Sequence, residues 1–190
     1  MSSNVVPLPT SATRRHLSDR QARTVSRLIE AALEELTEVG YPTLTVRSVA
    51  KRAGVAPATA YTYFGSKEHL VAEVFWRRLA STPVPPDDSP DPVERVIAVL
   101  RHIALLVADE PELAGAVTTA LLGKDPDVEH LRFRIGREIR ARLCSALGTQ
   151  SDWDVVESLE QLYAGALVRA GMGYASYTEI ATKLERSARL

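Results

Sequence analysis

The sequence lacks the residues and patterns that several functional classes require. Its only cysteine among 190 residues is Cys144, which excludes an internal disulfide and a cysteine-based metal site. No apolar run approaches the roughly 20 residues that a membrane-spanning helix needs. The first thirteen residues contain no apolar stretch of the kind that a secretory signal has. We therefore expect a cytoplasmic protein without a membrane segment.

Catalytic and cofactor-binding motifs are also missing. The four histidines are scattered without a His-x-x-x-His pair, and the single cysteine has no partner for metal binding. No Gly-x-Gly-x-x-Gly, Walker-type or Gly-x-Ser-x-Gly pattern occurs. The sequence thus disfavours an enzyme and predicts no catalytic residue, no metal and no cofactor.

The segment from Thr45 to Lys67 predicts two short helices joined by a tight turn. Thr45 is placed to cap the first helix, whose apolar side consists of Val46, Val49, Ala50 and Ala53. Gly54 supplies the positive φ that ends this helix, and Pro57 suits the first turn of the next one. The second helix carries polar and aromatic side chains suited to base edges and phosphates, namely Thr59, Tyr61, Thr62 and Tyr63. Together these features predict a helix-turn-helix.

Charge is unevenly distributed along the chain. The total is −1, but the residues up to Ala80 contain eleven Lys and Arg against seven Asp and Glu, a net +4, which leaves −5 for the remainder. A basic front and an acidic rear suit a protein of which only one end meets phosphate. Chance asymmetry is the alternative, and charge alone does not decide between them.

Helical periodicity predicts an all-α fold of about nine helices. The first begins at Ser18, which forms a capping box with Gln21, and ends at Gly40. The helix-turn-helix follows at about 46–53 and 57–64, and Ser66 starts a fourth helix that reaches about residue 80. A proline-rich loop at 81–92 separates these from helices at about 92–109, 111–122, 126–147, 152–174 and 177–188.

Short motifs between residues 18 and 80 follow a known pattern: Thr45 to Ala50, Ala53-Gly54-Val55, Tyr61-Thr62-Tyr63-Phe64, Ser66-Lys67-Glu68 and Leu70. In these residues the chain resembles the TetR family of transcriptional regulators. Two positions depart from the family pattern: Ala56 replaces a capping side chain, and Ala60 replaces a larger apolar one. The first weakens the cap of the second helix by about 1 kcal/mol, partly offset by Pro57.

The resemblance implies a domain order and a set of DNA contacts. We expect a flexible basic arm at 1–16, a DNA-binding domain at 17–64, a connecting helix at 65–80, the loop at 81–92, and an effector-binding and dimerisation domain at 93–190. The expected DNA-binding residues are Thr45, Arg47, Ala58, Thr59, Tyr61, Thr62, Tyr63 and Lys67. For Arg47 a guanine edge and a phosphate remain open, and for Tyr61 a core position is the alternative. Arg14 and Arg15 either enter a minor groove or belong to a solvated tail.

The rear domain is expected to join two copies of the chain, because one helix-turn-helix reads only a few base pairs. The predicted interface residues are Leu159, Tyr163, Ala166, Gly173, Ile180 and Leu184. They instead belong to the core of a single copy if the last two helices pack inward.

A small lipophilic effector is the expected ligand of the rear domain, since its helices are rich in aliphatic residues. The residues expected to line its pocket are His102, Leu106, Val117, Leu121, Phe133 and Tyr163. The favoured function is a ligand-responsive homodimeric repressor on a palindromic DNA operator. An interaction module that no longer reads DNA is the remaining rival.

Overall fold

The computed structural model describes residues 18–84 and 89–188, and in these the chain forms helices and no strand. The all-α prediction is therefore confirmed. The helices are α1 (Asp19–Thr43), α2 (Val46–Arg52), α3 (Pro57–Tyr63), α4 (Lys67–Ser81), α5 (Pro92–Leu105), α6 (Pro111–Leu122), α7 (Pro126–Leu147), the 3-10 turn η1 (Gly148–Gln150), α8 (Trp153–Gly171) and α9 (Tyr177–Ala188). None of these helices is both long and apolar enough to cross a membrane.

The first helix begins at Ser18 as predicted, and its regular helical geometry breaks at Gly40. Ser18 caps it in a capping box, with the Ser18 N–H donating to Gln21 Oε1 at 2.9 Å. Gly40 has a φ of 73°, which kinks the helix, and a further turn then continues to Thr43. That turn is closed by the Leu44 N–H, which donates to the Gly40 carbonyl at 3.2 Å. The helical backbone conformation therefore ends at Gly40, as the sequence predicts, and the single turn that follows is a separate one.

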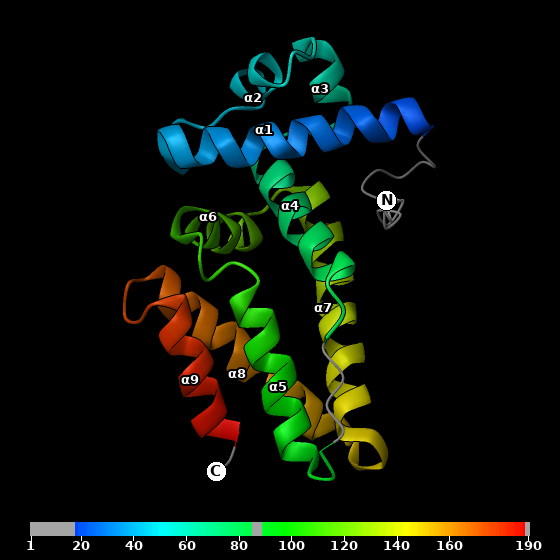
Figure 1. Ribbon diagram of the computed structural model, residues 1–190, viewed down its shortest axis with the longest axis vertical. Helices are drawn as coiled ribbons and strands as arrows, with labels where there is room; N and C mark the ends of the chain where they lie inside the picture. The colour runs from blue at the N-terminus through cyan, green and yellow to red at the C-terminus, as the bar shows by residue number, and fades with distance from the viewer. Residues whose placement is uncertain (1–17, 85–88, 189–190) are drawn as a thin grey trace, which may run out of the picture.

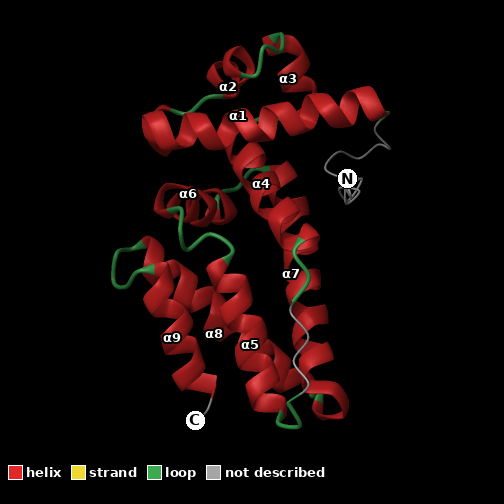
Figure 2. Cartoon of the chain, viewed as in Figure 1, coloured by secondary structure: helices red, strands yellow, loops and turns green. Residues whose placement is uncertain are grey.

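The helix-turn-helix lies at one end of an elongated molecule (Figure 1). Helix α1 runs across that end, with α2 and α3 on its outer side, and α4 leads from it toward the rear domain. Figure 2 shows that helices account for nearly all the described residues and that short loops join them. Helix α4 packs against α6 and α7, so it is in contact with the rear domain along much of its length.

The rear domain is built around α5, which packs against α7 on one side and α9 on the other. Helix α8 packs against α6, α7 and α9. Two helices end earlier in the chain than the sequence predicts: α5 ends at Leu105 instead of about residue 109, and α8 ends at Gly171 instead of about residue 174. After α8 the chain turns at Gly173, whose φ of 80° does not fit a right-handed helix.

Candidate nucleic-acid interface

Local hydrogen bonds define where α2 and α3 begin. The Thr45 hydroxyl accepts from the Ser48 N–H at 3.0 Å, and Ser48 Oγ accepts in return from the Thr45 N–H at 3.3 Å. Gly54 adopts a φ of 62°, and the Val55 N–H donates to the Ala50 carbonyl at 2.9 Å, which reverses the chain. Helix α3 starts without a side-chain cap, as Ala56 predicts, and has proline in its first turn. The tight turn that the sequence predicts is thereby confirmed.

Helix α3 has one face in the core and one in solvent. Ala60 and Phe64 are fully buried, so the small side chain at position 60 brings α3 close to the helices behind it. The exposed positions are Ala58, Thr59, Tyr61 and Thr62, and Tyr61 is 49% exposed. Tyr63 is half-buried and packs against the core. The polar face of α3 is therefore available to a macromolecule that approaches this end of the protein.

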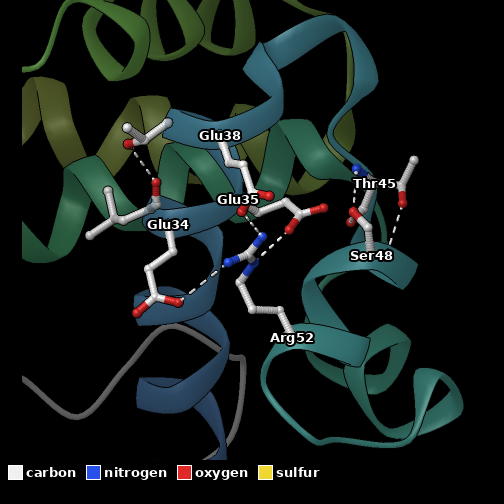
Figure 3. Close-up of polar contacts among 8 residues, drawn as sticks. Glu34, Glu35, Glu38, Thr45, Ser48 and Arg52 are labelled. Carbon is white, nitrogen blue, oxygen red and sulfur yellow. Dashed lines mark hydrogen bonds and ion pairs between the residues drawn. The ribbon is translucent and has the colours of Figure 1, made fainter.

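Helix α2 is tied to α1 by the guanidinium of Arg52 (Figure 3). Arg52 Nε donates to Glu35 at 2.5 Å, Nη2 donates to Glu38, and Nη1 lies 3.8 Å from Glu34. The hydrogen bond from Arg52 lowers the pKa of the Glu35 carboxyl, and burial opposes this shift. The charge of Arg52 is thus matched by carboxylates of α1, which leaves it in a structural role.

Two further cations of this domain hold backbone carbonyls. The Arg27 guanidinium donates to the Ala53 and Gly54 carbonyls at the end of α2. Lys67 Nζ donates to the Tyr41 carbonyl at 2.9 Å and to the Pro42 carbonyl at 3.2 Å, and lies 4.5 Å from the centre of the Tyr41 ring. An ammonium has three donors, so Lys67 keeps one for a phosphate.

Arg47 and Lys51 are the cations of α2 that face outward. Both are exposed, and neither makes a hydrogen bond or ion pair with the described part of the chain. They border a shallow hollow at the junction of α2 and α3 together with Thr45, Ser48 and Pro57. Sequence reasoning missed Lys51 and Ser48, although the spacing of four residues from Arg47 to Lys51 places both cations on one face of a helix. Two cations and two hydroxyls around one hollow form a surface suited to a phosphate.

Residues 28–74 match the sequence model of a protein family described as "Bacterial regulatory proteins, tetR family". Over 168 residues the chain is 51% identical to an uncharacterized HTH-type transcriptional regulator of Mycobacterium tuberculosis, covering 87% of this chain and 78% of that protein. The chain belongs to the TetR family. It is accordingly a DNA-binding transcriptional regulator of the helix-turn-helix type.

Two further matches, one in sequence and one in structure, extend over most of the chain. The HTH-type transcriptional repressor KstR of Rhodococcus jostii is 26% identical, over 91% of this chain and 84% of KstR. The crystal structure of a TetR transcriptional regulator from Rhodococcus sp. RHA1 superposes with a TM-score of 0.77 at 28% identity, covering 91% of this chain and 96% of that one. The likeness therefore extends through the rear domain and is not confined to the helix-turn-helix.

The residues expected to line an effector pocket do not share one environment in this TetR-family chain. Val117 and Tyr163 are buried, whereas His102, Leu106 and Leu121 are half-buried. Phe133 is 72% exposed on α7 and contributes nothing to the interior of the subunit. In the described part of the chain no group of three or more His, Cys, Asp or Glu side chains is arranged to hold a metal ion.

The residues expected at the dimer interface are also divided. Tyr163 and Ile180 are buried within their own subunit, and Leu159 and Ala166 are half-buried against its core. The reason is that α9 packs along α5 of the same chain. Gly173 is exposed, while the side chain of Leu184 lies outside the described residues. Arg14 and Arg15, the expected minor-groove arm, also lie outside them.

Proposed function

We propose that the protein is a homodimeric, ligand-responsive repressor that binds a palindromic operator with α3 in the major groove. The observation that carries the proposal is the joint exposure of the polar face of α3 and of the cations Arg47 and Lys51 at one end of the molecule. The name of the relative KstR, a transcriptional repressor, supports the direction of the response. The cytoplasm is the proposed compartment because the DNA is there.

The roles within this interface divide between positioning and reading. We assign Lys51, Lys67 and the capped N-terminus of α2 at Thr45 to phosphates, together with the hydroxyls of Tyr61 and Tyr63. We assign contacts with base edges and thymine methyl groups to the exposed residues of α3, namely Ala58, Thr59 and Thr62. Arg47 lies at the start of α2, and we assign it to a guanine edge.

A second copy is proposed to pack on the exposed face of α8. Gly165 lies at the centre of that face, Val155 and Ala164 lie on its two opposite edges, and Met172 extends it just beyond the helix. The small residues at 164 and 165 allow close approach, since a Cβ added at Gly165 meets nothing within 4 Å. Two-fold pairing through α8 would place the two α3 helices on successive major-groove faces of a palindrome.

The function is tested by selecting bound fragments from genomic DNA and titrating the best fragment with salt. Enrichment of a palindrome, bound as two protomers and retained against competitor DNA at physiological salt, is the expected result. Weak binding to every fragment that fades steeply with salt would reject sequence-specific regulation. A stable monomer at micromolar concentration that nevertheless binds the palindrome would reject the dimer alone.

Replacing Lys51 by alanine is expected to weaken binding about fivefold at physiological salt on every DNA sequence alike, since a phosphate contact carries no sequence information. The slope of log affinity against log salt concentration should become shallower by about 0.9, the value for one released counterion. Fluorescence anisotropy on the selected palindrome and on a scrambled duplex measures both quantities.

Lys183→Ala is the matched control, because Lys183 is an exposed lysine of α9 at the opposite end of the molecule. It should leave the affinity and the salt slope unchanged. An unchanged slope in Lys51→Ala would show that Lys51 makes no phosphate contact.

A further inference from the structure

The first turns of α1 carry arginines on one side of the helix. Arg20, Arg23 and Arg27 are all exposed, and the intervals of three and four residues between them place their side chains on one face. From Asp19 to Ile29 the sequence contains three arginines and one acid, Asp19, so this part of α1 has a net charge of 3 − 1 = +2. The N-terminal half of α1 therefore has a basic face.

The hydrogen bonds of Arg27 show which way this face is turned. The Arg27 guanidinium donates to the Ala53 and Gly54 carbonyls, which belong to the turn between α2 and α3. Arg20 and Arg23 lie on the same face of α1, closer to its start, and Figure 1 shows that α1 begins beyond the edge of α3. The two arginines therefore extend the surface that α2 and α3 form at this end of the molecule.

Arg20 and Arg23 have no partner in the described part of the chain. The Arg20 carbonyl accepts from the Thr24 hydroxyl at 3.0 Å, but neither guanidinium makes a hydrogen bond or an ion pair there. The second half of α1 is different, because three of its glutamates surround the guanidinium of Arg52. The charge of Arg52 is thus balanced within the domain, whereas the charges of Arg20 and Arg23 are not.

The position of Arg20 is unfavourable for an isolated helix. It lies in the first turn of α1, where the positive end of the helix dipole opposes a cation and favours an acid such as Asp19. A second guanidinium three residues away, at Arg23, adds like-charge repulsion. An anion that carries several regularly spaced charges removes both effects. The DNA duplex is such an anion, with one negative charge per about 1.7 Å of its axis.

The position of the basic face indicates which part of the duplex it meets. The rise of an α-helix separates the backbone of Arg20 from that of Arg27 by about 10 Å, the length of about three base pairs. Figure 1 shows that α1 begins on the side of the molecule opposite to α9 and to the C-terminal end of α8. If a second copy packs on α8, Arg20 and Arg23 therefore lie outward from the two-fold axis, beyond the bases that α3 reaches.

We propose that Arg20 and Arg23 form a second DNA contact, which binds backbone phosphates of the duplex on the outer flank of each half of the operator. This inference rests on the proposed binding of a palindrome by α3 and adds a separate surface to it. A guanidinium suits this role, because its planar fork can bind a phosphate through two parallel hydrogen bonds. Full affinity then requires a duplex longer than the palindrome, and the sequence of the added base pairs does not matter.

The test compares the full-length protein on three duplexes that share the selected palindrome. One duplex extends about 10 base pairs beyond the palindrome on each side, the second has the same length but scrambled flanks, and the third ends at the palindrome. Fluorescence anisotropy gives the affinity and its dependence on salt. The variant is Arg20→Gln/Arg23→Gln, and Arg20→Lys/Arg23→Lys keeps its charge. The matched control is Arg101→Gln/Arg137→Gln, which removes two exposed arginines of the rear domain.

We expect removal of the flanks to weaken binding of the wild type about tenfold and binding of Arg20→Gln/Arg23→Gln less than about twofold. On the long duplex the glutamine variant should bind about tenfold more weakly than the wild type, with a salt slope shallower by about 1.8 per protomer, the value for two released counterions. The lysine variant should keep the salt slope. Scrambled flanks and the rear-domain control should leave the affinity unchanged.

Three results would overturn the proposal. The glutamine variant could lose as much affinity as the wild type when the flanks are removed, which would assign the flank contact to other residues. The rear-domain control could weaken binding as much as the glutamine variant, which would make net charge the cause. The flanks could also have no effect on the wild type. In each case the palindrome is still bound and the proposed function stands, whereas failure to bind any palindrome would reject the proposed function itself.

Discussion

Replacing Phe64 by alanine is expected to lower the free energy of unfolding by about 4 kcal/mol, the range for a fully buried aromatic side chain. Phe64 is completely buried at the C-terminal end of α3. Its ring meets the imidazole of His69 on α4 edge to face, with centroids 5.5 Å apart. The side chain therefore joins the recognition helix to the connecting helix, and its loss leaves a cavity between them.

Urea unfolding followed by circular dichroism measures this effect, and Phe133→Ala is the matched control. Phe133 is 72% exposed, so its removal should change the unfolding free energy by no more than about 0.5 kcal/mol in the isolated subunit. Operator binding should fall in Phe64→Ala, because α3 is no longer held against α4. Equal stability of the two variants would mean that the α3–α4 contact is not formed in solution.

The elements that sequence could predict are those specified by near neighbours. The capping boxes at Ser18 and Thr45 and the turn at Gly54 all depend on residues within a few positions of one another. Such local chemistry determines where a helix starts and where the chain reverses. The shape of the helix-turn-helix, and hence the family, was accessible for that reason.

The contacts between distant residues were not predictable. Periodicity shows which side of a helix is apolar, but it does not show which helix covers that side. The apolar side of α9 was assigned to a second copy, whereas Ile180 is buried within its own subunit. The sequence also did not show that carboxylates of α1 bind Arg52, so it could place Lys51 on the same face as Arg47 but could not show which cations of α2 stay unpaired.

Replacing Glu73 by glutamine is expected to stabilise the protein at pH 8 and to have little effect at pH 5. Glu73 is completely buried on α4; Arg77 Nε donates to its Oε1 at 2.8 Å, and its Oε2 has no partner in the described chain. Burial raises the pKa of its carboxyl from 4.5 to about 7, against the opposing effects of Arg77 and of Arg134 from α7. Glutamine keeps the acceptor for Arg77 and cannot ionise.

The direction in which stability changes with pH follows from the direction of the pKa shift of Glu73. A folded-state pKa above the unfolded one means that the native protein holds the proton more tightly, so the stabilising contribution is complete below pH 4.5 and is lost as the pH rises through about 7. The wild type should therefore lose about 2.5 kcal/mol from this group between pH 5 and pH 8, a loss that Glu73→Gln avoids. Glu30→Gln, at an exposed position of α1, serves as the control for a simple change of net charge. Unfolding free energies of the three proteins at both pH values give the difference directly. A gain in Glu73→Gln that is the same at pH 5 and pH 8 would locate its origin in packing, and the ionisation of Glu73 would then not weaken the fold near neutral pH.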